Sequence, residues 1–370
     1  LHVEPGPGGG VLERWLSEAR SANAGRLRRG FVDAGVDDIE VITALPDETP
    51  FGARLRALVQ GLDTALGRDA GGLIVLGSGA VPLARSADFR ALSAVAGSGE
   101  PRALVNNRYS ADVVAVGRAD ILRDVPDLPG DNALPRWLEE VAGIRVEDFR
   151  AQARLQMDLD SPIDVLLIGK PPAKARRMAP PAGFHMGAAA PAGVDIGAVR
   201  ERMAALLDVA ADRRAELLVA GRTSPTSLRG LERATACRIR ALIEERGLRA
   251  STPMAMAAPP TKVRPPRSVL GLLLDERGPA ALGAVVTALS DGAVIDTRVL
   301  LAHRLGADER RWPAAEDRFA SDLLLPDRIG DGWLRALTAS ALTAPVPIVL
   351  GGHSLVGPGL RLLLRRRRSR

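Results

Sequence analysis

A glycine-rich turn in the first half of the chain is the first feature that could bind a ligand. The apolar run 72–76 (GLIVL) has the length and composition of a buried strand, and Gly77, Ser78 and Gly79 follow it at once. Glycines at the end of a strand let the backbone approach a ligand closely. We therefore predict that this turn takes part in a binding site.

Two carboxylates further along the chain are candidates for a metal site. Asp158 and Asp160 lie two positions apart in the segment 158–162 (DLDSP). Carboxylate oxygens are hard ligands of the kind that Mg²⁺ prefers, and Mg²⁺ bridges the phosphates of nucleotides. The alternative is that these side chains serve a turn and a helix cap.

A polar cluster between these two segments could contact a base, a sugar or a phosphate. Asn106, Asn107 and Arg108 directly follow an expected strand. Open α/β sheets bind their ligands at the carboxyl ends of the strands, which is where these residues would lie. The alternative is a polar turn whose side chains hydrogen-bond their own backbone.

The second half of the chain carries a possible anion site. Its four candidate residues are basic or imidazole side chains near the ends of expected strands and helices: Arg298, His303, Arg318 and His353. Together they could hold a phosphate or a carboxylate. The alternative is that each forms an ion pair between a strand and a helix.

Apolar periodicity predicts alternating strands and helices in the first half of the chain. The expected strands are 39–43, 72–76 and 103–106, and the expected helices are 12–30, 51–66, 87–96, 134–141 and 146–156. The segment 163–168 fits either a strand or a helix. This alternation is typical of an α/β fold with a mostly parallel sheet.

The second half repeats the alternation. Strands are expected at 216–220, 269–274, 293–301 and 347–350, and helices at 199–211, 225–247, 279–289, 314–324 and 331–342. The fold class is therefore α/β, with an N-terminal mostly parallel sheet and a second α/β domain.

Proline- and alanine-rich segments divide the chain. Residues 170–194 lack periodicity and are typical of a linker, so we expect domains at 1–169 and 195–364. The segment 251–267 has a similar composition. Residues 365–370 form a basic tail.

The composition excludes several classes of protein. All but three of the 50 basic residues are arginines, and the five arginines of the tail carry most of the net charge of +6. Since only 3% of residues are aromatic, few side chains could stack on bases, and we expect no nucleic-acid partner. The single cysteine, Cys237, excludes an intrachain disulfide and a cysteine-based zinc site.

No apolar run in the sequence is long enough for a transmembrane helix. The N-terminal segment lacks the pattern of a signal peptide, so we expect a cytoplasmic protein. We expect the second domain to provide substrate specificity, contacts in a homo-oligomer or a separate site.

The segments 73–83 (LIVLGSGAVPL) and 158–162 resemble two motifs of the nucleotidyltransferases with a glycosyltransferase-A-like fold. The most similar members are those that act in molybdenum cofactor synthesis and on 2-phospholactate. The resemblance spans residues 11–168. It implies a Rossmann-like first domain, a nucleotide held near residues 77–79 and 106–108, and Mg²⁺ on Asp158 and Asp160.

The resemblance also implies a reaction, the transfer of a nucleotidyl group from a nucleoside triphosphate to a phosphorylated small molecule. The chain departs from the family at Ala80, because the family has a metal-binding aspartate two positions before the proline of its Pro-Leu pair. The glycine-rich segment 5–10 follows no clear strand. A second hypothesis is therefore a catalytically inactive homologue that binds a nucleotide or a protein.

Overall fold

The computed structural model describes residues 1–45, 47–66, 71–128, 130–169, 189–245 and 266–367. These residues form two compact units, the first made of 1–7 and 17–158 and the second of 8–16, 159–169 and 189–367. The division thus comes after residue 158 rather than at 169. The predicted linker lies outside the described residues up to position 188, and so do tail residues 368–370.

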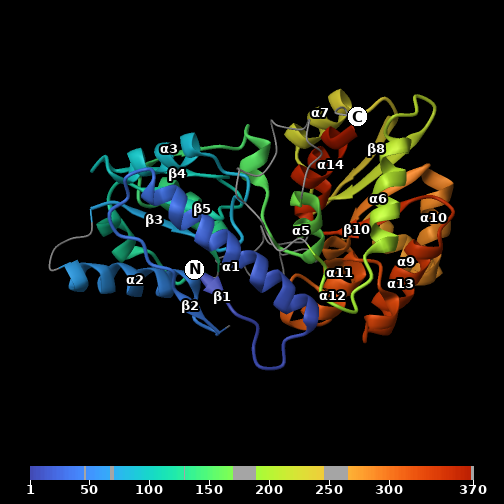
Figure 1. Cartoon of the computed structure of the whole chain (residues 1–370), viewed down its shortest axis with the longest axis horizontal. Helices are drawn as coiled ribbons and strands as arrows, with labels where there is room; N and C mark the ends of the chain where they lie inside the picture. Colours follow the sequence, from blue (N-terminus) through green and yellow to red (C-terminus); the bar gives the residue numbers. More distant parts are fainter. Residues whose placement is uncertain (46, 67–70, 129, 170–188, 246–265, 368–370) are drawn as a thin grey trace. The chain divides into compact units, whose positions relative to one another are not determined.

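The first unit alternates strands and helices. Its elements are β1 (His2–Val3), α1 (Val11–Val32, with residues 11–16 grouped with the second unit), β2 (Thr43–Ala44), α2 (Phe51–Leu66), β3 (Leu73–Leu76), α3 (Ser86–Ala96), β4 (Arg102–Val105), β5 (Val113–Val116), α4 (Leu134–Glu140) and β6 (Arg145–Asp148) (Figure 1). Strands β1 and β2 pair in parallel, and the other four form a sheet in the order β3-β5-β4-β6.

One strand of this four-stranded sheet runs against the others. Strand β5 is antiparallel to both β3 and β4, whereas β4 and β6 are parallel. All four residues of β5 are buried, and they alternate between two apolar layers. Val114 and Val116 pack with α2 and α4, and Val113 and Ala115 pack with α1 and α3. Helices therefore cover both faces, which explains why β5 is a continuous apolar run.

The second unit is built around a fully parallel sheet. Its elements are α5 (Pro162–Ile168), α6 (Gly197–Val209), β7 (Glu216–Gly221), α7 (Pro225–Ala234), β8 (Arg238–Ile243), α9 (Val269–Arg277), α10 (Leu282–Leu289), β9 (Gly292–Asp296), α11 (Thr297–Leu305), α12 (Ala315–Asp322), α13 (Gly332–Thr343), β10 (Ile348–Gly351) and α14 (Leu360–Arg367). The strand order is β10-β9-β7-β8. The expected α/β fold class is confirmed in both units.

Several expected elements differ from the structure. Residues 269–274, expected as a strand, begin helix α9, and residues 297–301 of another expected strand lie in α11. Residues 238–243, expected in a helix, form the edge strand β8, and 145–148 form β6. Short apolar runs fit either periodicity, so pairing with a neighbouring strand decides between them.

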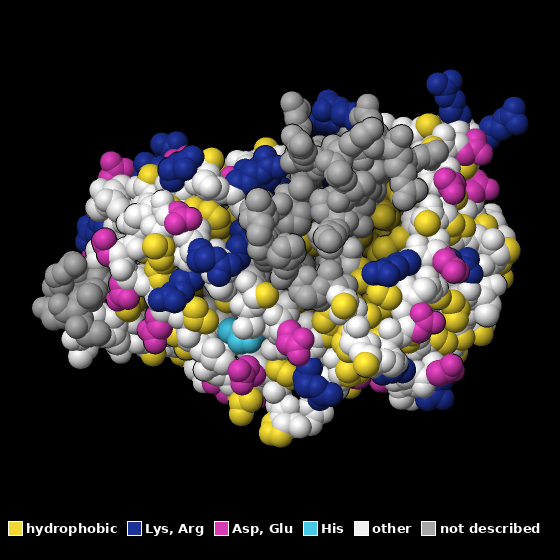
Figure 2. All heavy atoms as spheres, in the orientation of Figure 1, with side chains coloured by type: hydrophobic (Ala, Val, Ile, Leu, Met, Phe, Trp, Pro, Cys, Tyr) yellow, Lys and Arg dark blue, Asp and Glu magenta, His cyan; other side chains and the backbone are white. Residues whose placement is uncertain are grey.

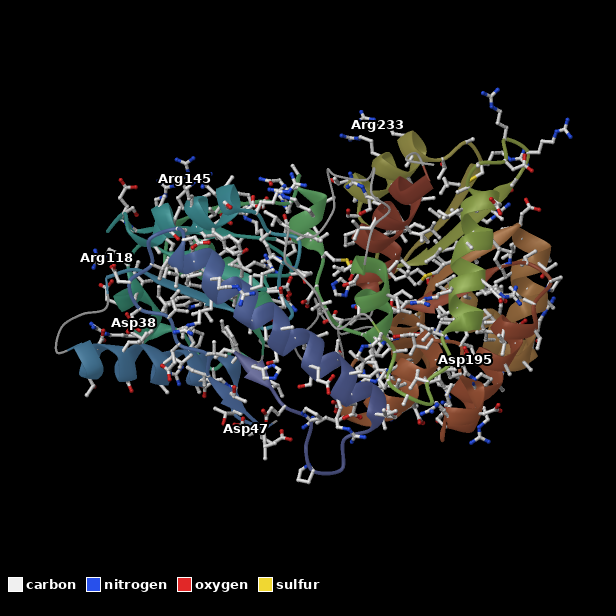
Figure 3. The ribbon with its side chains drawn as sticks, viewed as in Figure 1. Asp38, Asp47, Arg118, Arg145, Asp195 and Arg233 are labelled. Atoms are coloured by element: carbon white, nitrogen blue, oxygen red, sulfur yellow. The ribbon has the colours of Figure 1, made fainter. Side chains whose placement is uncertain are left out.

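The surface mixes both signs of charge. Acidic and basic side chains are interspersed on the face drawn in Figure 2. Arg118 and Arg145 extend outward from the first unit, and each pairs with a nearby carboxylate, Asp120 or Glu147 (Figure 3). Over the described residues, no helix combines the length and the apolar character needed to cross a membrane.

Gly72, immediately before β3, lies against the end of α3. A Cβ atom there would come within 1.8 Å of the Ala96 carbonyl oxygen, whereas a Cβ at Gly71 would have no neighbour within 4 Å. We predict that Gly72→Ala lowers the free energy of unfolding by about 1–3 kcal/mol, because backbone must move. The matched variant Gly71→Ala should change it by less than about 0.5 kcal/mol. Urea unfolding measures both values, and equal effects would contradict the packing described.

Candidate functional site

A cavity of about 240 Å³ lies in the first unit, where β3 ends. The turn 77–80 forms part of its wall. Apolar side chains from β1, β3, β5 and α2 line it together with Arg20 and three aspartates, Asp112, Asp131 and Asp158. Two segments that the sequence singled out, residues 77–79 and Asp158, thus line the same cavity.

The turn after β3 is fixed by backbone hydrogen bonds on three sides. The Ala80 N–H donates to the Gly77 carbonyl at 3.1 Å and closes the turn. The Gly77 N–H donates to the Asp112 carbonyl at 3.2 Å, and the Ser78 N–H donates to the Leu1 carbonyl at 2.8 Å. Ser78 and Gly79 therefore occupy the central positions of a turn with a defined direction.

Helix α1 holds the same turn through two buried side chains. Asn23 Nδ2 donates to the carbonyls of Ser78 and Ala80 at 2.8 and 2.9 Å. The Arg26 guanidinium donates to the carbonyls of Val81 and Ala84 at 2.9 and 3.1 Å. Burial lowers the pKa of Arg26 to about 10, with a smaller effect from Arg29, so it remains protonated at neutral pH.

Two features of the next residues mark this turn as unusual. Val81 has φ +39°, which is strained for a β-branched residue and is found mainly where the surroundings impose it. Ala80 pairs with Asp158 in an isolated antiparallel bridge. Ala80, where the nucleotidyltransferases that the sequence resembles have an aspartate, therefore lies opposite Asp158.

A histidine and two serines form a hydrogen-bonded chain beside the cavity. His2 Nδ1 lies 3.0 Å from Ser78 Oγ, and His2 Nε2 lies 3.4 Å from Ser17 Oγ. His2 and Ser78 are each 6% exposed. Burial lowers the pKa of His2, and the charge of Arg20 adds to this, whereas Glu4 opposes it. The imidazole is therefore neutral at pH 7.

The acidic side chains of the cavity are of the type that binds Mg²⁺. Among the described residues, no group of three or more histidine, cysteine, aspartate or glutamate side chains is arranged to hold a metal ion. Mg²⁺ needs fewer protein ligands, because it takes one or two carboxylates and completes its shell with phosphate oxygens and water. Asp112, Asp131 and Asp158 line the cavity, and any one or two of them would supply the carboxylate oxygens that this mode of binding uses.

The side chains of Asn106, Asn107 and Arg108 make their hydrogen bonds within the protein. Asn106 Nδ2 donates to the Asp112 carboxylate at 2.8 Å, and its Oδ1 accepts from the Asp112 N–H at 2.9 Å. Asn107 Oδ1 accepts from the Tyr109 N–H at 3.0 Å, and Arg108 pairs with Glu139. These contacts favour the polar-turn alternative, although Asn106 does position a cavity residue, Asp112.

Asp158 and Asp160 have different surroundings. Asp158 lines the cavity of the first unit, whereas Asp160 belongs to the second unit, where its Oδ2 lies 3.3 Å from His353 Nδ1. The N–H groups of Asp160 and Ser161 donate to the Asp164 carboxylate, which caps the start of α5. Asp160 therefore takes part in a helix-cap segment.

The second unit gathers charged side chains at the carboxyl ends of its strands. Arg222, which follows β7, donates two hydrogen bonds to Asp296 at 2.6 and 3.0 Å. Burial alone would raise the pKa of Asp296, but Arg222 lowers it below its usual value. The strand order reverses between β7 and β9, which is where open α/β sheets bind ligands.

A second buried pair lies beside the first. Both carboxylate oxygens of Asp322 accept from the Arg298 guanidinium, and Oδ2 also accepts from Ser161 Oγ at 2.5 Å. Asp322 and Asp296 have 0% side-chain exposure. Both arginines are therefore bound to carboxylates, which leaves little of their charge for an anion.

The four residues of the predicted anion site have separate partners. His303 accepts from the Ser268 N–H at 3.0 Å and pairs with Asp275, both near α9. Arg318 pairs with Glu309 and lies over the Trp312 ring. Arg298 and His353 bind Asp322 and Asp160, as described above. All four side chains therefore have an ion-pair partner within the second unit, which is the alternative to an anion site.

Comparison with known proteins does not extend these observations, since no family model, curated protein or solved structure matches the chain. Sequence reasoning missed His2, Ser17, Arg20 and Asp131 as residues at or beside the cavity. They carried no local signal, because a fold brings them to the turn from distant segments.

Asp164 gives a test of the electrostatics of the second unit. It is 1% exposed, and its Oδ1 has no hydrogen-bond partner within the described residues. Burial, reinforced by the charges of Asp160 and Asp322, raises the pKa of Asp164 well above its usual value. In the unfolded chain the carboxyl ionises near pH 4, so unfolding releases a proton and stability falls as the pH rises above that value.

We predict that Asp164→Asn removes this loss. The difference in unfolding free energy between variant and wild type should move in favour of the variant from pH 4 upward. The change should be about 1.4 kcal/mol for each unit by which the pKa is raised. Urea unfolding at pH 4, 5.5 and 7.5 measures it, and a difference independent of pH would contradict the raised pKa.

Proposed function

We propose that the first unit binds a nucleoside triphosphate with Mg²⁺ and transfers its nucleotidyl group to a phosphorylated small molecule. The observation that carries this proposal is the meeting of the turn 77–79 and Asp158 in one cavity. These are the two segments for which the nucleotidyltransferase resemblance implies nucleotide and metal binding. Gly79 and Asp158 are separated by 79 positions in the sequence, so it is the fold that brings them together.

The size of the cavity indicates which part of a nucleotide it would hold. Its volume of about 240 Å³ is below the range of about 300–1,000 Å³ that is typical of small-molecule sites. We therefore place the phosphate end inside and the rest of the nucleotide outside. Gly77 and Gly79 permit a close approach of phosphate oxygens to the backbone.

The cavity side chains have distinct roles in this proposal. Asp158 and Asp112 would hold Mg²⁺, and when bound this ion neutralises phosphate charge. Arg20 would contact a phosphate oxygen. The bonds from Asn23 and Arg26 keep the turn in place, so that the site is formed before the nucleotide binds.

One observation favours a second candidate function. Ala80 lies opposite Asp158 and cannot ligate a cation, so the pair of carboxylates implied by the family is incomplete at that point. A module that binds a nucleotide without transferring it would tolerate this change. Release of pyrophosphate in the presence of phosphorylated acceptors distinguishes the transferase from such a module.

We predict that a nucleoside triphosphate raises the Tm of the full chain only when Mg²⁺ is present. At 100 times its Kd, a ligand that binds the folded state adds about 2.7 kcal/mol to stability. Asp158→Asn should remove the Mg²⁺-dependent part of the shift. A thermal-shift screen with the four common ribonucleoside triphosphates, with and without Mg²⁺, measures this.

The matched control is Asp38→Asn, since Asp38 is an exposed carboxylate of the same unit and lies away from the cavity lining (Figure 3). It should keep the full shift. The absence of a shift with every nucleotide would overturn the proposed function. A shift that Asp158→Asn leaves intact would remove the metal role assigned to this residue.

A further inference from the structure

We infer that Ser78 is a nucleophile that takes the nucleotidyl group onto its own oxygen, with His2 as its general base, before an acceptor receives the group. The inference rests on the proposed function, because it concerns the same cavity and the same nucleotide. It adds a covalent step and two catalytic residues that neither the resemblance nor the sequence pattern assigned.

The first support is the way in which Ser78 is presented. It lies two residues after the end of strand β3, occupies a central position of a closed turn and lines the cavity. The turn is held by the Ala80, Gly77 and Ser78 N–H groups and by Asn23. A nucleophile on a rigid turn at the end of a strand needs little reorganisation to reach a bound electrophile.

The second support is a histidine within reach of the serine hydroxyl. His2 Nδ1 lies 3.0 Å from Ser78 Oγ, within the distance required for proton transfer. Ser17 Oγ is 3.4 Å from the other ring nitrogen, where it can accept a hydrogen bond from Nε2–H. The proposal uses the tautomer protonated at Nε2, in which the Nδ1 lone pair faces Ser78 Oγ. Burial, which keeps His2 neutral, maintains it as a base at pH 7.

The third support is a donor next to the nucleophile. The N–H groups of Gly77, Ser78 and Ala80 all donate hydrogen bonds. The Gly79 N–H, by contrast, has no acceptor among the described residues. The N–H of the residue after a nucleophilic serine is a common donor to the oxygen on which charge develops. Gly79 therefore completes a set of nucleophile, base, orienting residue and donor.

Ala80 stands where the nucleotidyltransferase pattern has an aspartate, and this departure favours a nucleophile carried by the protein. Ala80 lies opposite Asp158 and offers no carboxylate to a metal ion, so the metal could give little activation to the acceptor at that point. A nucleophile carried by the protein removes the need to activate the acceptor in the first step.

The reaction balances in two steps. Ser78 Oγ attacks the α-phosphorus, the bond from that phosphorus to the bridging oxygen breaks, and pyrophosphate leaves with the electron pair. The hydroxyl proton moves to His2 Nδ1. In the second step an oxygen of the acceptor phosphate attacks the same phosphorus, and Ser78 Oγ leaves and takes the proton back from His2.

The adduct itself provides the test. The full chain is incubated with Mg²⁺ and the four α-³²P-labelled ribonucleoside triphosphates, without an acceptor. We expect a labelled protein whose mass increases by one nucleoside monophosphate, and peptide mapping should place the group on Ser78. A serine phosphodiester survives acid, whereas a phosphate on a histidine nitrogen does not, so acid treatment distinguishes Ser78 from His2.

Ser78→Ala should abolish labelling, whereas the matched control Ser21→Ala, on the exposed surface of α1, should label like the wild type. His2→Gly should slow labelling by about 100-fold or more. Added imidazole should partly restore it, because free imidazole can replace a missing base but, having no covalent link to β1, cannot tie that strand to the turn.

Two negative results overturn the inference in different ways. A Mg²⁺-dependent thermal shift without a Ser78 adduct leaves the proposed function intact and shows that the His2–Ser78 bond only ties β1 to the turn. The same conclusion follows if the label lies on another residue. The absence of both shift and adduct overturns the proposed function and the covalent step together.

Discussion

The backbone of the turn after β3 is largely buried, so its carbonyl groups need hydrogen-bond donors from within the protein. The shape of the cavity depends on which groups supply these donors. Helix α1 supplies the donors through Asn23 and Arg26, which together bond the carbonyls of four residues between 78 and 84. These bonds fix the rotation of α1 and the direction of the turn at the same time. With its carbonyls bonded to α1, the turn keeps Ser78 and Gly79 in the lining of the cavity. The strain at Val81 is tolerated because both flanking segments are held.

The second unit meets the requirement for buried polar groups in a different way. At the carboxyl ends of its parallel strands, Arg222 and Arg298 are each held by a buried aspartate, and Ser161 joins the second pair. Breaking such a pair leaves a buried charge without a partner, and so these pairs specify how α5, α11 and α12 pack. In both units, polar side chains gather where strands of the sheet end, but they bond to different kinds of partner. In the first unit the donors serve the backbone and a cavity remains, whereas in the second the charges neutralise each other.

The sequence predicted most of the fold where an element is long and its apolar pattern matches one periodicity. Five elements lie close to their expected ranges: helices α3, α12 and α13 and strands β3 and β7. Strand β5 was missed because its four apolar residues follow a polar turn and show no alternation, which burial on both faces explains. Strand β8 carries two arginines in a run that also fits a helix, and its strand character comes from pairing with β7. These elements depend on neighbours that a local pattern does not contain.

The candidate site was predictable only in those parts that lie within one segment. The turn 77–79 was found because glycines after an apolar strand have a local meaning, whereas the partner of Ser78 stands 76 positions away at His2. Asp158 and Asp160 show the same limit at short range. They match one motif and differ by two positions, yet Asp158 lines the cavity, whereas Asp160 belongs to the segment capped by Asp164 and pairs with His353. The chemistry of a carboxylate or a hydroxyl depends on the groups that surround it, and the fold brings most of those groups from other segments.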